Sequence, residues 1–530
     1  MKKRILPVLA PVCLLSVVSL SGCGFKKETA DTDALDVNIE TRGATISFWT
    51  GFGSAVNTVL EPIIEEFEQK TGITVEYESK GGYSNLQTAI NLSATKKQYA
   101  NVAVGYPDHF AGYINSNIQL RLDGLIKSDA NRQMVGKDEE GYDVDKDGLR
   151  KLNYSDFYSD YTLENETLEF DSEGNGYVLG IPFNKSSEVM VYNAQFFNWA
   201  KTQDSIKDTI FVPSTWAEVK SVGLAVKQFF ASKGVYGKML YSDGNTYASA
   251  EDAPEAATLV LDATGVASED DFRLLSYDST ENLFITLVRQ FGGTYTELDK
   301  SINGKGYAAF NDADKKDKTL AAMAMYRDLG DNKIVGIPAT FGESLYCSTP
   351  FKKGQSLLNI GSTGGLGNAV GGFEVKAAPI PQNEKLPNTK YVISQGTNLA
   401  LFAKGTEKEK VAAWKLIVFL SQQVNGKFAA GTGYFPTCKA AHDSADYQEY
   451  LEEAFSGKEL LQQEAAVING TTYADTTNGW VRFVDPAFRG SSAVRIEVGY
   501  IPGYILSGEI GNDQQILDDV YSKIRDYVRG

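Results

Sequence analysis

Gly180-Ile-Pro-Phe-Asn-Lys-Ser-Ser-Glu-Val-Met-Val-Tyr-Asn193 is the segment around which the rest of this chain is organised. It follows a polar, glycine-rich turn, and its apolar and polar residues alternate with the period of two that is typical of a strand. Pro182 fixes φ and has no N–H group, so Asn184, Ser186 and Ser187 lie on a stiffened part of the segment. The sequence therefore predicts a strand that offers short hydrogen-bonding side chains to something outside the sheet.

The chain has 530 residues, which is enough for two or three domains with sizeable cores. Hydrophobic residues at 42% and charged residues at 22% are typical of a soluble globular protein. The formal net charge is -17, and removal of residues 1–22, which carry three basic residues and no acid, makes it -20. Such a surface repels phosphate backbones and anionic lipid, so the composition argues against a nucleic-acid partner.

The N-terminus predicts export. Lys2, Lys3 and Arg4 precede an apolar run that contains prolines and ends in Leu20-Ser21-Gly22-Cys23, the pattern of a secretory signal rather than of a spanning helix. The final tetrapeptide resembles a lipobox, which implies a signal peptide over residues 1–22 and a lipid anchor on Cys23. Residues 23–43 are polar and lack periodicity, so we expect a flexible tether at the outer face of a membrane. The alternative is a plain secreted protein with an unpaired Cys23.

Few residues remain for metal or nucleophilic chemistry. His109 and His442 are the only histidines, which argues against a catalytic triad or a histidine-rich zinc site. Beyond the predicted signal and anchor, the cysteines are Cys347 and Cys438. They could pair in an oxidising compartment, but their separation in sequence does not determine their distance.

A calcium-loop pattern lies in the acidic region between Leu122 and Tyr177. Asp143, Asp145 and Asp147 alternate and are followed by a glycine, as in the first half of an EF-hand loop. The twelfth position is a tyrosine where a full loop has a bidentate glutamate, so the motif is incomplete. The three carboxylates are candidate calcium ligands, and the alternative is a solvated acidic loop.

Periodicity predicts a βαβαβ unit at the start of the mature chain. Strands are expected at Thr45–Trp49, Ile73–Tyr77 and Val102–Val104, and helices between them, the second with a capping box of Ser84 and Gln87. This order requires a parallel sheet whose ligand crevice lies at the carboxyl ends of its strands.

The rest of the chain is expected to alternate less regularly. Thr215 and Glu218 form a capping box, and helical segments dominate residues 217–329. Further strands are predicted at 356–360, 375–381 and 392–401, the last of them interrupted at 394–398. A glycine-rich, hydroxyl-rich loop follows the first of these strands and can bring backbone N–H groups close to a ligand. Helices are predicted at 408–420 and 514–528.

These motifs together resemble one family, the extracellular solute-binding lipoproteins of bacterial ABC importers (family 1, sugar and glycerol-3-phosphate-binding type). The resemblance rests on Pro182-Phe-Asn-x-Ser with the later Tyr192-Asn193, on Phe48-Trp-Thr-Gly51, Gly81-Gly-Tyr-Ser84 and Val104-Gly-Tyr-Pro-Asp-His109, and on Pro379-Ile-Pro381 and Gly433-Tyr-Phe-Pro436. It implies an α/β, two-lobed periplasmic-binding-protein fold with crossover hinge strands. The implied N-terminal lobe comprises residues 44–178 and 395–462, and the C-terminal lobe residues 179–394 and 463–530.

The resemblance also implies a ligand site between the lobes. The implied ligand-binding residues are Tyr83, Asp108, Ser186, Ser362, Gly396, Tyr434 and Arg495, the last of which grips phosphate in the glycerol-phosphate-binding members. Trp49 is added as an aromatic side chain that could stack on a sugar ring, although core packing explains it nearly as well. The inserted Pro107 and the long acidic region depart from the family pattern and leave the ligand open.

The implied function is capture of a carbohydrate or glycerophosphate by lobe closure and its delivery to the transmembrane subunits of an ABC permease. We expect a monomer that is not an enzyme, is held to the membrane by its lipid, and needs no cofactor other than a structural calcium ion at most. Two alternatives stay open. One is a secreted carbohydrate-active hydrolase with paired carboxylates, and the other is a calcium-dependent surface adhesin or sensor.

Overall fold

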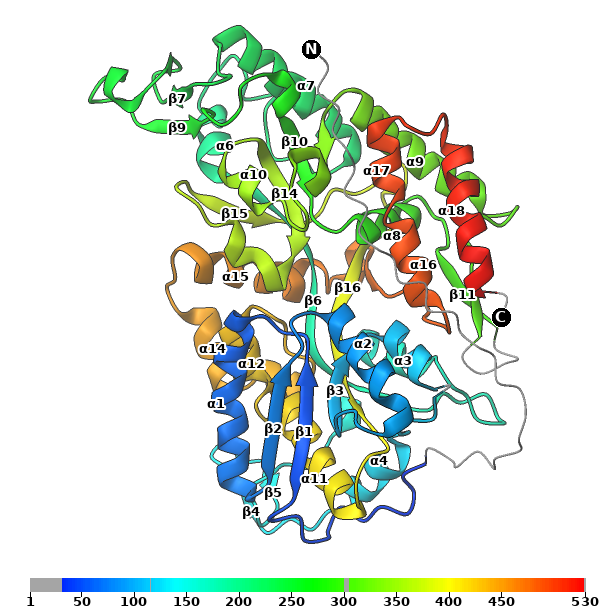
Figure 1. Ribbon diagram of the computed structural model, residues 1–530. Helices are drawn as coiled ribbons and strands as arrows, with labels where there is room; N and C mark the ends of the chain where they lie inside the picture. The colour runs from blue at the N-terminus through cyan, green and yellow to red at the C-terminus, as the bar shows by residue number, and fades with distance from the viewer. Residues whose placement is uncertain (1–30, 115, 300–304, 529–530) are drawn as a thin grey trace.

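The computed structural model describes residues 31–114, 116–299 and 305–528, which form two lobes joined by long strands (Figure 1). The predicted signal peptide and Cys23 lie outside the described residues. A ten-stranded sheet runs through both lobes in the order β13-β10-β14-β6-β16-β3-β1-β2, with β15 paired to β6 and β17 to β16. In the part of the chain that the structure describes, no helix has both the length and the apolar character needed to cross a membrane.

The first lobe is built on the predicted βαβαβ unit. Its strands β1 (Thr45–Thr50), β2 (Thr74–Ser79) and β3 (Val102–Gly105) are parallel, as predicted. Helix α1 (Ser54–Thr71) packs its apolar face on the sheet and ends at Gly72, which has the left-handed conformation that the helix end requires. The predicted capping box of Ser84 and Gln87 is wrong. Helix α2 (Tyr83–Ser93) begins one residue before Ser84 and is preceded by Gly82, so Ser84 does not occupy the cap position.

The second lobe contains β10 (Arg273–Tyr277), β13 (Val335–Gly336) and β14 (Ser356–Ser362), which are parallel to one another. Helix α7 (Trp216–Lys233) begins with the predicted capping box of Thr215 and Glu218. The prediction that helices dominate residues 217–329 is only partly correct. The lobe also holds β7 (Met239–Tyr241), β8 (Thr246–Tyr247), β9 (Leu259–Asp262), β11 (Thr296–Leu298) and β12 (Gly306–Ala308) in this region.

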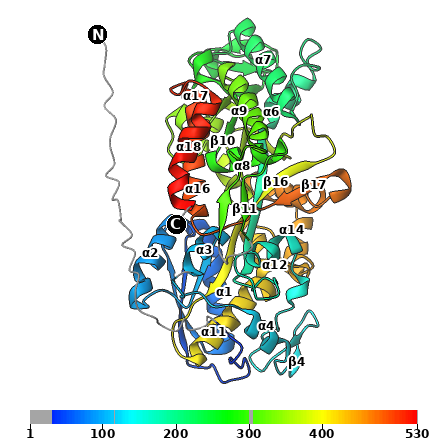
Figure 2. The same ribbon diagram turned by 90° about the vertical axis from the view of Figure 1, so that its right-hand side faces the viewer.

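Two strands pass from one lobe to the other. These are β6 (Ile181–Asn193) and β16 (Lys390–Leu401), which pair in antiparallel register (Figures 1 and 2). Ile181 and Phe183 belong to the core of the first lobe, whereas Val189 to Val191 belong to that of the second. Along β16 the order is reversed, and the strand is continuous with a bulge at Thr397 and Asn398 rather than interrupted. The polar residues between the two cores are therefore held in the sheet where the lobes meet.

The remaining elements are the helices around this sheet, its strands β15 and β17, and the separate hairpin of β4 and β5. They are α3 (Pro107–Ile114), α4 (Asp123–Ala130), β4 (Gly136–Lys137), β5 (Asp143–Val144), α5 (Ser159–Thr162), α6 (Ala194–Lys201), α8 (Thr280–Gln290), α9 (Lys316–Asp331), α10 (Ser348–Lys352), η7 (Thr363–Ala369), β15 (Val375–Ala378), α11 (Glu407–Val418), α12 (Asn425–Thr432), α13 (Lys439–His442), α14 (Ala445–Glu452), α15 (Gly457–Val467), β17 (Trp480–Phe483), α16 (Ser491–Val498), α17 (Ile501–Ser507) and α18 (Asp513–Val528). The division of the chain at the predicted lobe boundaries stays a prediction.

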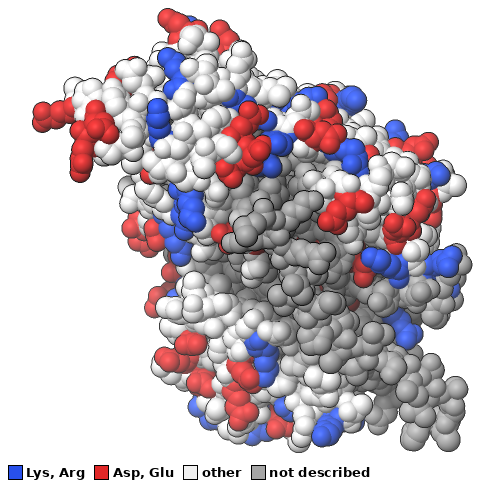
Figure 3. Space-filling model, turned by 45° about the horizontal axis from the view of Figure 1, so that its top comes forward, with Lys and Arg blue, Asp and Glu red and all other residues white. Residues whose placement is uncertain are grey.

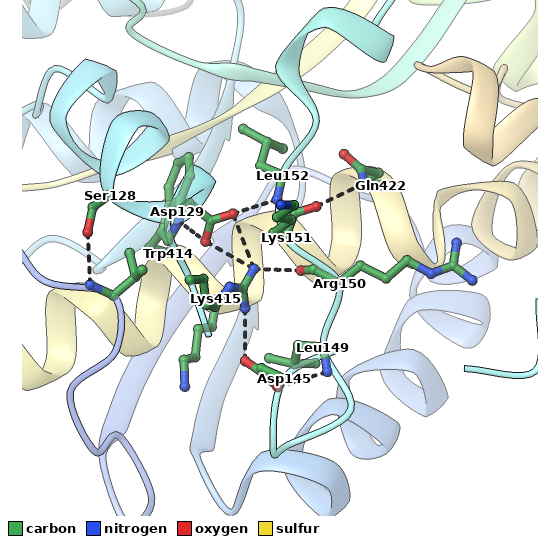
Figure 4. Close-up of polar contacts among 12 residues, drawn as sticks. Ser128, Asp129, Asp145, Leu149, Arg150, Lys151, Leu152, Trp414, Lys415 and Gln422 are labelled. Atoms are coloured by element: carbon green, nitrogen blue, oxygen red, sulfur yellow. Dashed lines mark hydrogen bonds and ion pairs between the residues drawn. The ribbon is translucent and has the colours of Figure 1, made fainter. Parts of the chain in front are cut away.

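The acidic region is attached to the first lobe by a buried ionic network. Asp129 accepts hydrogen bonds from the indole of Trp414 and the backbone N–H of Leu152 (Figure 4). The guanidinium of Arg132 lies 3.0 Å from Asp129 and 3.1 Å from Asp145, and all three side chains are buried. Because a buried charge is costly without a partner, the network holds this region in one position on the lobe.

The candidate calcium ligands take part in ion pairs. Asp143 pairs with Lys137 at 3.1 Å, Asp145 with Arg132, and Asp147 with Lys415 at 3.3 Å. Within the described ranges, no three His, Cys, Asp or Glu side chains are arranged to hold a metal ion. Calcium binding at Asp143, Asp145 and Asp147 therefore stays a prediction, and it would require these ion pairs to break.

Cys347 and Cys438 are free thiols, and both are buried. Burial raises the pKa of Cys438 to about 12, so the thiol is protonated and unreactive at neutral pH. The pairing that the sequence left open is therefore not formed.

Charged side chains of both signs are spread over the surface. On the face drawn in Figure 3, acidic and basic residues are interspersed over both lobes. The described part of this face carries no extended basic surface of the kind that binds a phosphate backbone.

Candidate functional site

The crossing strands carry a row of polar side chains on one face, which we call the cleft floor. It consists of Asn184, Ser186 and Glu188 on β6 and of Gln395 and Thr397 on β16. Alternate residues of a strand point to the same face, and the register places Gln395 opposite Ser186 and Thr397 opposite Asn184. Hydrogen bonds join the row: the Ser186 hydroxyl lies 3.5 Å from Gln395 Oε1, and Gln395 Nε2 donates to Glu188 at 3.3 Å. The floor is thus a continuous row of polar side chains between two apolar cores, and all of them except Gln395 are buried.

Aromatic side chains of the first lobe border one end of the floor. The hydroxyl of Tyr83, at the start of α2, accepts a hydrogen bond from Asn184 Nδ2 at 3.2 Å. The rings of Tyr83 and Tyr106 pack edge to face with centroids 5.0 Å apart, and Tyr434 stacks on Phe428. Burial raises the pKa of Tyr83 well above its ordinary value, so its hydroxyl stays protonated. This border offers apolar ring surface together with neutral hydroxyl groups.

The loop after β14 borders the floor from the second lobe. Ser362, at the end of β14, donates a hydrogen bond to Ser186 Oγ at 3.4 Å. Thr363 Oγ1, at the start of η7, accepts one from the backbone N–H of Ser187, also at 3.4 Å. A Cβ atom on Gly364 would lie 3.0 Å from the ring of Tyr434, so η7 meets the first lobe here. The absence of a side chain at Gly364 allows this close approach.

Arg495, on α16, is connected to the floor through α8. Its guanidinium donates to Asn282 Oδ1, and Asn282 Nδ2 donates to Glu188 Oε1 at 3.0 Å. The hydroxyl of Tyr277 donates to the other oxygen of Glu188. Because its Nδ2 donates to Glu188, the Asn282 amide turns its oxygen toward Arg495.

Two buried carboxyl groups, those of Glu188 and Asp485, feel the charge of the Arg495 guanidinium. Burial raises the pKa of Glu188 to about 7 and that of Asp485 to about 6, and the positive charge of Arg495 opposes both shifts. Asp485 also lies 3.1 Å from Arg289, yet neither of its buried oxygens accepts a hydrogen bond among the residues that the structure describes. The buried hydroxyl of Tyr295, which feels the charges of both Arg495 and Asp485, likewise lacks a partner there. This end of the site therefore has free hydrogen-bonding capacity and nearly balanced charge.

Gly396 allows the two crossing strands to pack closely. Its φ is +95°, and a Cβ atom there would lie 1.9 Å from the backbone oxygen of Asn184. The position therefore requires glycine for its conformation and for its space. Gly396 shapes the floor through its backbone rather than by offering a side chain.

Trp49 and Asp108 lie apart from the floor. Trp49, on β1, is half-buried beneath Lys80, whose ammonium group is 3.8 Å from the ring centre. Asp108 is in the first turn of α3 and accepts the backbone N–H of His109 at 3.0 Å. Helix α3 contacts α16, so Asp108 faces the same interface as Arg495. The structure thus gathers Tyr83, Ser186, Ser362, Gly396 and Tyr434 directly, brings Arg495 in through Asn282, and leaves Trp49 within its own lobe.

The sequence interpretation missed Glu188, Asn282 and Gln395. Strand alternation provided a signal for Glu188, since it follows Asn184 and Ser186 at the same spacing. The same alternation places Ser186 and Ser187 on opposite faces of β6, so only one of these two hydroxyl groups belongs to the floor. No local pattern marks Asn282, because only the packing of α8 against β16, the partner of β6 in the sheet, brings its side chain to Glu188.

The opposite face of the crossing strands carries a buried ion pair. The ammonium group of Lys185 contacts Glu164 and lies 3.4 Å from the carbonyl oxygen of Gly396. Asn398 Nδ2 donates to the same Glu164 oxygen at 2.6 Å, and Lys185 is fully buried. This pair fastens both crossing strands to the 163–165 segment of the first lobe.

Comparison with known proteins identifies relatives at the level of sequence profiles and folds. The profile of a family described as "Bacterial extracellular solute-binding protein" matches residues 62–454. No curated protein sequence matches the chain significantly.

Solved structures of transport proteins have a similar fold. UgpB from Mycobacterium tuberculosis, solved with glycerophosphocholine, has a TM-score of 0.61 and 16% sequence identity, with 92% of this chain and 98% of that chain covered. The GacH receptor of Streptomyces glaucescens, solved unliganded and with acarbose, has a TM-score of 0.61, 14% identity and the same coverage. The maltose/maltodextrin-binding domain MalE from Bdellovibrio bacteriovorus, bound to maltotriose, has a TM-score of 0.58, 17% identity and coverage of 92% and 100%. These likenesses confirm the predicted α/β, two-lobed periplasmic-binding-protein fold.

Proposed function

Because the chain belongs to the family of bacterial extracellular solute-binding proteins, we propose that it binds a neutral, hydroxyl-rich solute of the carbohydrate class on the cleft floor. The observation that carries this proposal is the row of amide, hydroxyl and carboxyl groups between the two cores, bordered by Tyr83, Tyr106 and Tyr434. Hydroxyl groups of a sugar need a partner each once water is excluded, and aromatic rings pack against the apolar faces of the sugar.

The charges around Arg495 favour a carbohydrate over a glycerophosphate. Glu188 and Asp485 both feel the charge of Arg495, and the guanidinium already donates to Asn282. A phosphate at Arg495 would be repelled by these carboxylates, whereas a sugar hydroxyl can donate to a carboxylate and accept from the guanidinium.

We further propose that a lipid on Cys23 anchors the protein and that the cleft lies outside the membrane. Lobe closure about β6 and β16 would exclude water from the solute, and the closed form would pass the solute to the transmembrane subunits of an ABC permease. We propose that it acts as a monomer and binds its solute without altering it.

Solute binding is expected to stabilise the mature protein against thermal unfolding. A neutral solute at one hundred times its Kd should add about 2.7 kcal/mol to the free energy of unfolding. The measurement compares maltotriose, maltose and ribitol with glycerol 3-phosphate and glycerophosphocholine, and chromatography checks that the bound solute is recovered unchanged. Stabilisation only by the phosphate compounds would contradict the carbohydrate assignment, and cleavage of an oligosaccharide would support the hydrolase alternative.

Ser186 is expected to contact the solute, whereas Ser187 is not. Ser186→Ala removes one hydrogen-bonding group from the floor, which is worth about 1 kcal/mol and so weakens binding roughly fivefold. Ser187→Ala is the matched control, because Ser187 belongs to the opposite face of the same strand. Calorimetric titration of both variants with the best solute measures the difference. Equal losses of affinity in the two variants would contradict the assignment of the floor.

A further inference from the structure

Glu188 is the group through which the charge of the cleft is coupled to both crossing strands. Its carboxyl accepts hydrogen bonds from Tyr277 on β10, Asn282 on α8 and Gln395 on β16. Its backbone oxygen accepts the hydroxyl of Tyr473 at 2.9 Å. Through Asn282 it is one hydrogen-bonded step from Arg495.

We propose that Glu188 is a proton-operated switch for the charge of the cleft: ionised, it balances Arg495 and the site takes a neutral solute, whereas protonated, it leaves Arg495 to attract an anionic group. The inference rests on the proposed function, since it adds a regulation to the same solute site. The anionic group is a sulfate, phosphate or carboxylate carried by a solute.

Protonation of Glu188 changes both the hydrogen bonds of its carboxyl group and the charge near Arg495. The ionised carboxyl accepts three hydrogen bonds from side chains, and a protonated carboxyl has one oxygen that donates instead. Glu188 is buried and Arg495 is half-buried, so water screens the carboxyl charge little, and loss of this negative charge strengthens the field of Arg495.

The direction of the pH dependence follows from these contacts. Burial raises the pKa of Glu188 to about 7, so the group is ionised above this pH and neutral below it. An anion bound at Arg495 favours the neutral form of Glu188, so Glu188 takes up a proton when the anion binds. Affinity for an anion should therefore rise as the pH falls through about 7 and level off at lower pH.

Other titratable groups face Glu188 and Arg495 and must be separated from this effect. They are Tyr277 at the end of β10, Asp278 directly after it, Tyr473 beside β6, Tyr106, Asp108 and His109 at α3, Tyr295 before β11, and Asp485 after β17. Burial raises the pKa of Asp278 to about 6, below that of Glu188. Burial lowers the pKa of His109, so this histidine becomes positively charged at a lower pH than an exposed histidine does.

Sulfate is the probe for the test, because its charge is constant from mildly acidic to mildly basic pH. Thermal unfolding of the wild type is followed with increasing sulfate at constant ionic strength. The same titration of Arg495→Gln measures the stabilisation by sulfate that does not depend on Arg495, and this value is subtracted from that of the wild type. Between about pH 8 and about pH 6, the Arg495-dependent affinity is expected to rise about tenfold, the change that one unit of pKa displacement produces.

The variants separate Glu188 from its neighbours. Glu188→Gln should give the tighter sulfate binding at both pH values, while Asp278→Asn and His109→Asn should keep the wild-type dependence. The proposal is overturned if Glu188→Gln retains that dependence, or if His109→Asn alone abolishes it. It is equally overturned if the wild type shows no Arg495-dependent sulfate binding near pH 6. This second test does not depend on whether the Glu188→Gln variant folds. Because no carbohydrate is used, failure of the switch is distinguishable from failure of carbohydrate binding.

Discussion

Glu164→Gln is expected to lower the free energy of unfolding by about 3 to 5 kcal/mol, the usual cost of removing one partner from a buried ion pair. Lys185 is fully buried behind the cleft floor, and Glu164 is the carboxylate in contact with its ammonium group. Without this carboxylate, Lys185 must either remain charged in an apolar surrounding or give up its proton. Urea unfolding of the mature protein measures the loss.

Two further variants test the cause of this loss. Asp443→Asn removes a partner of Lys439 in an ion pair that is exposed at the surface, and it should change the free energy of unfolding by about 0.5 kcal/mol or less. Combining Glu164→Gln with Lys185→Met should restore part of the stability, because no unpaired charge remains buried. If the single and double variants are equally unstable, the loss comes from packing rather than from charge.

Gly396→Ala is expected to cost about 2 to 5 kcal/mol and to abolish solute binding. Part of the cost, about 1 to 2 kcal/mol, comes from the left-handed backbone, and the remainder, about 1 to 3 kcal/mol, from forcing the crossing strands apart. The added methyl group would lie 1.9 Å from the backbone oxygen of Asn184, so the strands cannot keep their register. Urea unfolding and calorimetric titration measure the two effects.

Substitutions at two other glycines distinguish the cost of the left-handed backbone from the cost of the close contact with Asn184. Gly174 has a φ of +87° and open space around its missing side chain, so Gly174→Ala should cost only the backbone term. Gly372→Ala has open space and no left-handed backbone, and it should be close to neutral. Equal losses at Gly396 and Gly174 would show that the close contact with Asn184 is relieved at little cost.

Much of the fold follows from patterns that are local in the sequence. The alternation in Gly180–Asn193 predicts β6, the βαβαβ order predicts the parallel strands of the first lobe, and Thr215 with Glu218 predicts the start of α7. These predictions succeed because hydrophobic periodicity and end caps act over a few residues. The short strands between 239 and 308 were missed, because a strand of two to five residues has too few positions to show its period.

The sequence by itself determined which residues are polar along the crossing strand and where glycine is needed. Only the tertiary structure decided which of them share a site. Asn282 reaches Glu188 across 94 positions and Arg495 reaches Asn282 across 213, and no local rule carries information over such separations. Likewise, the incomplete calcium loop became part of an ionic network because Arg132 and Lys415 lie beside it in space. Charge and hydrogen bonding depend on distances between atoms, and these are set only when the lobes pack around β6 and β16.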